Sequence, residues 1–171
     1  MAITKIQSES LNLSDTYDFT GTVTGAGGTN TPAFLAFGDN VTSQTISTNT
    51  VTKVTNITES FDTDSAFASS RFTVPSGEDG KYFFYASTRM NTASDIGSIE
   101  LTIFKNGIPS GTEIGKSQGS HWYYDSKTAV SIVNLSAADY VEMAVYHNFG
   151  SNVNISGSPG HTYFGGYKII T

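Results

Sequence analysis

The chain has 171 residues and a formal net charge of −6; only 14% of its residues are charged, whereas 37% are hydrophobic and 12% aromatic. The acidic balance, without any Lys or Arg cluster, argues against nucleic acid as a partner. The lack of cysteine excludes disulfides, thiolate metal sites and cysteine nucleophiles. No segment approaches the ~20 apolar residues that span a bilayer, so we expect no membrane partner.

Residues 1–31 form a polar segment that ends in a glycine-rich run. Glycine at this density lets the backbone bend freely, so the segment cannot bury apolar side chains by itself. We interpret it as an attachment arm that docks on its own domain, a sister chain or another protein; the alternative is a frayed terminus. Its candidate anchors are the spaced apolar and aromatic residues Ile3, Ile6, Leu11, Leu13, Tyr17 and Phe19.

From residue 32 onward the pattern predicts short β-strands. Ile99, Leu101 and Ile103 alternate with polar residues, which is the period of a strand with one buried face. Turn-forming residues separate the strands, and no helical period stands out. This pattern predicts one all-β sandwich or barrel domain over residues 32–171. The expected strands cover residues 32–37, 51–55, 60–61, 67–74, 81–88, 99–105, 128–135, 141–147 and 162–170.

The strand expected at residues 81–88 carries aromatic side chains on both faces. Tyr82 and Phe84 share one face, and Phe83 and Tyr85 share the other. Because both faces then need cover, one face should fill the sandwich and the other should meet a neighbouring subunit. The alternative is a monomer with partly exposed tyrosines. The aromatics that we assign to the core or to a subunit interface are Tyr82, Phe84, Tyr146, Tyr163 and Tyr167.

Four segments carry a family pattern. Phe72 is followed by Gly80, Tyr82 and Phe84; residues 99–107 read as a strand that ends in Lys-Asn-Gly; residues 133–141 hold Leu-Ser-Ala-Ala-Asp-Tyr-Val; and residues 163–170 begin Tyr-Phe-Gly-Gly. Together they resemble the C1q/TNF-like jelly-roll family. The resemblance implies a jelly-roll β-sandwich that assembles as a homotrimer, with N-terminal extensions leaving from one end. Ala138 departs from the pattern, since the family usually has glycine before this aspartate.

The arm has a resemblance of its own. Residues 1–6, followed by Phe-Thr-Gly-Thr-Val-Thr-Gly-Ala-Gly-Gly at 19–28, look like the N-terminal segments of tailed-phage virion proteins. Residues 1–7 lack the apolar core of a signal peptide, which agrees with synthesis in a bacterial host cytoplasm. The two resemblances imply a trimeric virion-surface protein that decorates the capsid by binding the major capsid protein through its arm. The alternative is a tail-fibre or adhesin tip that binds host surface glycan.

Candidate chemistry is sparse. The loop of His121, Trp122, Tyr123, Tyr124 and Asp125 combines rings with polar groups, as a sugar or protein ligand requires, although Trp122 could equally pack into the sandwich or the trimer seam. Asp62 and Asp64 could begin a Ca²⁺ site, but a solvated loop is the default. The histidines lack metal-motif spacing, and no nucleophile elbow or phosphate loop is present. We therefore expect a protein that is not an enzyme and has no cofactor.

Overall fold

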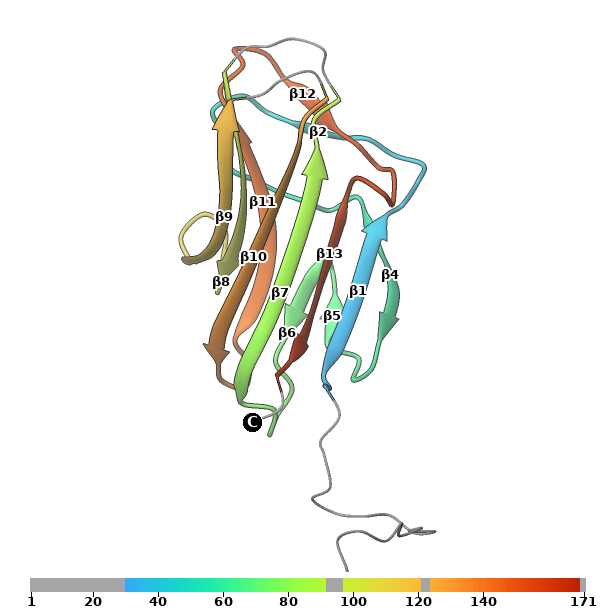
Figure 1. Cartoon of the computed structure of the whole chain (residues 1–171), viewed down its shortest axis with the longest axis vertical. Helices are drawn as coiled ribbons and strands as arrows, with labels where there is room; N and C mark the ends of the chain where they lie inside the picture. The colour runs from blue at the N-terminus through green and yellow to red at the C-terminus, as the bar shows by residue number, and fades with distance from the viewer. Residues whose placement is uncertain (1–29, 92–96, 121–123, 170–171) are drawn as a thin grey trace, which may run out of the picture.

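The computed structural model describes residues 30–91, 97–120 and 124–169, which form two packed antiparallel sheets joined by turns and loops. Figure 1 shows the strands β10, β7, β13 and β1 side by side, with β8, β9 and β11 in a layer of their own. The strands are β1 (Ala33–Gly38), β2 (Gln44–Ile46), β3 (Thr52–Lys53), β4 (Ile57–Asp62), β5 (Phe67–Ala68), β6 (Arg71–Thr73), β7 (Gly80–Arg89), β8 (Ser98–Lys105), β9 (Thr112–Ser120), β10 (Ser126–Leu135), β11 (Tyr140–His147), β12 (Val153–Ile155) and β13 (Tyr163–Lys168).

The first sheet has the order β10-β7-β13-β1-β4, and the second has the order β5-β6-β11-β8-β9, with β3 also paired to β11. A small ribbon of β12 and β2 lies beyond them. Strands far apart in sequence are neighbours, as where β1 pairs with β13, so most contacts are non-local. This confirms the all-β sandwich expected from the sequence.

The core lies between the sheets and combines aliphatic side chains with a cluster of packed rings. Phe34 of β1 lies 4.9 Å, centroid to centroid, from both Phe67 and Phe72, and 5.0 Å from Phe164. Tyr82 is fully buried beside Phe72, and its hydroxyl donates a 2.6 Å hydrogen bond to the Glu78 carbonyl. Burial raises the pKa of this phenol, with a further contribution from the Glu78 carboxylate. Tyr and Phe thus supply a large part of the buried area, together with the aliphatic residues of the core.

One strand prediction was wrong in detail, and one strand was not predicted. The single strand expected at residues 67–74 is a hairpin, because Ser69 and Ser70 adopt φ of 51° and 55° and turn β5 back onto β6. Residues 112–120, which were not among the expected strands, form β9, which pairs with β8 along its length. Its sequence is polar and contains two glycines, so it lacks the alternation that marks a strand.

The described chain begins and ends at the same end of the sandwich. The amide of Lys168 donates to the carbonyl of Pro32 at 3.0 Å, and the amide of Ile169 donates to that of Lys81 at 2.8 Å. Figure 1 shows the start of β1 and the end of β13 at this lower end. The anchors assigned to the arm, Ile3 to Phe19, lie outside the described residues.

Candidate functional site

The outer side of the first sheet carries a broad, uncharged set of mainly apolar and aromatic side chains. The strand register aligns them in rows across the sheet. One row runs from Val130 through Tyr85, Gly165 and Leu35 to Phe61, and crosses all five strands. The next rows whose side chains lie on this same side, one through Phe83 and Tyr167 and the other through Tyr163 and Phe37, add further rings, and none of these three rows contains a charged residue. We call this surface the aromatic face; it comprises Leu35, Phe37, Phe61, Phe83, Tyr85, Val130, Ile132, Tyr163 and Tyr167.

Aromatic rings pack against one another at the centre of this face. Phe83 lies 5.5 Å from Tyr167, and Tyr85 lies 6.1 Å from Tyr163, centroid to centroid. The Tyr85 ring lies over Gly165, where an added Cβ would stand only 2.5 Å from the Tyr85 hydroxyl. Burial raises the pKa of the Tyr85 phenol, and the neighbouring phenols of Tyr163 and Tyr167 add to the shift. Glycine at position 165 therefore lets this ring lie against the backbone.

The periphery of the aromatic face is strongly exposed. Ile132 is 67% exposed, Val130 59% and Phe61 46%. A soluble monomer rarely exposes a contiguous apolar surface of this kind, and such surfaces usually mark interaction sites. Charge depletion with aromatic enrichment is also typical of the centre of a protein interface.

The aromatics singled out from the sequence are divided between three places. Tyr82 and Phe84 are fully buried in the core. Tyr163 and Tyr167 lie on the aromatic face beside Phe83 and Tyr85. Tyr146 lies on the outer side of the second sheet, where its hydroxyl donates to the Asn49 side chain at 3.2 Å. Sequence reasoning missed Val130 and Ile132, although the apolar run around them in β10 carries side chains for both faces.

The outer side of the second sheet contains an open groove of about 640 Å³. Its walls are the segment 50–53 and the turn at residues 106–110, and its floor holds Arg71, Tyr140 and Glu142. We call it the outer groove. A volume of this size is typical of small-ligand pockets. This groove could not be predicted from the sequence, since its residues come from four separate segments.

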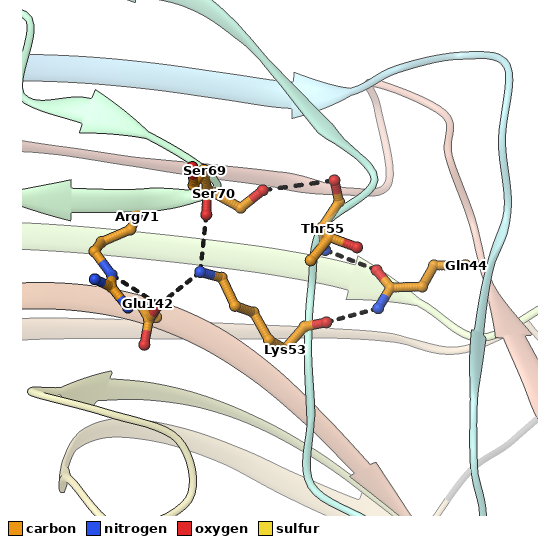
Figure 2. A network of polar contacts seen from close by, with 7 residues as sticks. All are labelled: Gln44, Lys53, Thr55, Ser69, Ser70, Arg71 and Glu142. Atoms are coloured by element: carbon orange, nitrogen blue, oxygen red, sulfur yellow. Dashed lines mark hydrogen bonds and ion pairs between the residues drawn. The ribbon is translucent and has the colours of Figure 1, made fainter.

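A network of polar contacts fixes the groove floor (Figure 2). Glu142 is nearly buried, and its Oε1 accepts from Lys53 Nζ at 2.6 Å and from Arg71 Nε at 2.9 Å. The Lys53 ammonium also donates to the Ser69 carbonyl at 2.8 Å. Gln44 donates to the Lys53 carbonyl at 2.6 Å and accepts from the Thr55 amide at 2.7 Å, which holds β3 in place. Two cations against one carboxylate leave the floor with one net positive charge.

The loop proposed as a ligand site is only partly described, because His121, Trp122 and Tyr123 lie outside the described residues. Tyr124 is 43% exposed, and the Arg89 guanidinium lies 5.4 Å from its ring centroid. Asp125 forms an ion pair with Lys127. Both residues precede β10 at the end of the sandwich opposite to the chain entry, because Ser126 pairs with Arg89 while Leu135 pairs with Gly80.

The remaining polar candidates have structural partners. His147 is buried and bonded to the Ile46 carbonyl, and His161 lies between Arg89 and Ser156. Burial and the Arg89 charge lower the pKa of His161. Asp62 accepts from the amides of Asp64 and Phe67, so it shapes the turn after β4. Within the described ranges, no three histidine or acidic side chains are grouped to hold a metal ion.

The same described ranges contain no helix with the length and apolar character of a membrane span.

Comparison with known proteins identifies the fold but no sequence relative: no family model matches the chain, and no curated protein sequence matches it. Solved structures do match. Murine APRIL superposes with a TM-score of 0.59 at 15% identity, covering 80% of this chain and 98% of that chain. Eiger TNF from S. frugiperda gives a TM-score of 0.60 at 11% identity, covering 81% and 92%. The globular domain of zebrafish complement 1qA gives 0.55 at 17%, covering 81% and 98%. The chain therefore has the C1q/TNF-like jelly-roll fold.

Proposed function

We propose that this chain is a non-enzymatic structural protein on the surface of a tailed-phage particle, where it acts as a homotrimer of the capsid-decoration type. The observation that carries the trimer is the aromatic face. Each subunit exposes it on one side of the sandwich, and burying it against sister copies removes Ile132, Val130 and Phe61 from water. A ring of three copies closes without leaving an unpaired surface.

In this proposal, the arm of residues 1–31 attaches the trimer to the particle by binding the major capsid protein. Two features support this assignment: the resemblance of the arm to phage virion proteins, and the position of the chain entry. Because Pro32 lies next to Lys168 at one end of the sandwich, three subunits packed in parallel would release their arms on the same side. The subunits would be made in the host cytoplasm and would join the particle there.

A second placement is a tail-fibre or adhesin tip that binds host surface glycan. One observation favours it: Tyr124 and Asp125 lie at the end of the sandwich farthest from the chain entry. On a protein anchored by its arm, this end would point away from the particle. Tyr124 and Asp125 would then meet the host surface first.

One experiment separates the two placements. Purified full-length protein is labelled and mixed with purified empty heads and, separately, with host cells. A decoration protein co-sediments with the heads and leaves the cells unlabelled. Co-sedimentation with cells alone would replace decoration by the adhesin placement, and binding to neither would remove both.

A further inference from the structure

The outer groove has the features of a ligand site that remains open in the proposed trimer. Glu142 lies on the outer side of β11, because its neighbours Val141 and Met143 point into the core. The groove is therefore on the opposite side of the sandwich from the aromatic face. Subunit contacts through the first sheet would leave it in contact with solvent.

Arg71 presents an unused hydrogen-bonding edge to the groove. Its Nε is bonded to Glu142, and its guanidinium carbon lies 3.9 Å from the centroid of the Tyr140 ring. These two contacts fix the plane of the guanidinium, while the side chain stays 41% exposed. Among the described residues, its two terminal amino groups have no carboxylate partner. A planar fork held in this way suits a carboxylate that binds through both oxygens.

The rest of the groove offers groups that suit hydroxyls and a sugar ring. The second carboxylate oxygen of Glu142 forms no hydrogen bond within the described residues, so it can accept from a hydroxyl. The exposed Ser110 hydroxyl lies on one wall. Val51 and Ile108 add apolar contact from the two walls. Apolar walls combined with a few fixed polar groups are the usual composition of a small-ligand site.

We propose that the outer groove binds a saccharide that carries a carboxylate. The carboxylate pairs with the terminal amino groups of Arg71, and the ring hydroxyls bond to Glu142 and the groove walls. The local charge agrees with this ligand, since the floor is positive within a chain whose net charge is −6. The proposal does not depend on where the chain sits on a particle.

The test uses the full-length chain and three probes: methyl β-D-glucuronoside, methyl β-D-glucoside and acetate. Saturation-transfer NMR with titration should give a dissociation constant on the order of 1 mM for the glucuronoside. The glucoside lacks the carboxylate and should bind at least about tenfold more weakly. Acetate should also bind at least about tenfold more weakly, because it lacks the ring. Equal binding of all three probes, or no binding of the glucuronoside, would overturn the proposal.

Two variants locate the site. Arg71→Lys keeps the charge but removes the fork, and should weaken glucuronoside binding about tenfold. Ser110→Trp fills the groove from an exposed wall position and leaves the Glu142 ion pairs intact, so it should also weaken glucuronoside binding. It therefore tests the site even if Arg71→Lys fails to fold. Lys81→Ala, an exposed cation outside the groove, is the control and should bind normally. Unchanged binding in folded Arg71→Lys or in Ser110→Trp would contradict this site. Neither variant should alter co-sedimentation with heads, so a failure here is distinguishable from failure of the decoration proposal.

Discussion

Ala138 occupies a backbone conformation that suits glycine. Its φ is 69°, and it precedes Asp139 in the turn between β10 and β11. A residue with a Cβ costs roughly 1–2 kcal/mol in this region, while glycine costs roughly 0.5–1 kcal/mol in chain entropy. Ala138→Gly should therefore raise the free energy of unfolding by about 0.5–1 kcal/mol, measured as a higher urea midpoint. Ala137→Gly is the control and should give no gain; an equal gain there would contradict the explanation.

Asp139 ties two turns together and should make the fold sensitive to acid. Hydrogen bonds from Asn106 and Lys105 lower its pKa to about 2 from an ordinary 3.8. As pH falls, the Asp139 carboxylate therefore takes up a proton in the unfolded chain at a higher pH than in the folded chain. The contribution of Asp139 to stability is complete above about pH 4 and is lost as pH falls through about 2. Urea midpoints measured from pH 6 to pH 2 should fall more steeply for the wild type than for Asp139→Asn. Parallel curves would contradict this assignment.

At the scale of strands, the sequence predicted strand positions best where each face of the strand has a single environment, either core or outer surface. β7 and β8 were predicted nearly to their ends, because their buried side chains alternate or form dense runs. The β5–β6 turn could not be predicted, since Ser69 and Ser70 reach positive φ without the Asn-Gly signal of a tight hairpin. The aromatic second face of β7 was predicted, but the neighbouring contributions of Leu35 and Phe61 depend on a register that only the fold supplies.

The strand β10 offers a direct test of the subunit interface. Ile132 is 67% exposed in one subunit, so Ile132→Asp should change the stability of an isolated subunit by no more than about 0.5 kcal/mol. In a closed trimer the same carboxylate would be desolvated without a partner, which costs far more. We expect the wild type to sediment as a trimer and Ile132→Asp as a folded monomer.

Val41→Asp is the matched control for this substitution. Val41 is 86% exposed and lies outside the aromatic face, so the variant should remain trimeric. A wild-type chain that sediments as a single subunit at micromolar concentration would remove the proposed trimer, whatever the variants do.

At the scale of the whole molecule, the aromatic face, the outer groove and the chain entry lie at separate positions, so each can serve a different function. The aromatic face covers one side of the sandwich, the outer groove lies on the other side, and the chain enters at one end. Assembly through the first sheet would therefore obstruct neither the arm nor the groove. The sequence alone indicated the aromatic strand, but the groove depends on segments that only the jelly-roll topology brings together; the arm remains a prediction.

This separation predicts that the arm can be removed without loss of the domain. The described core contains its own apolar cluster, from Phe34 to Phe164, and β1 begins at Ala33. Deletion of residues 1–28 should leave a trimer whose thermal midpoint is within a few degrees of the wild type, but which no longer co-sediments with heads. Full-length Lys81→Ala, purified in the same way, is the control and should co-sediment with heads as the wild type does. If the truncated chain fails to fold, residues 1–28 belong to the core; if it folds and still binds, attachment uses the domain itself.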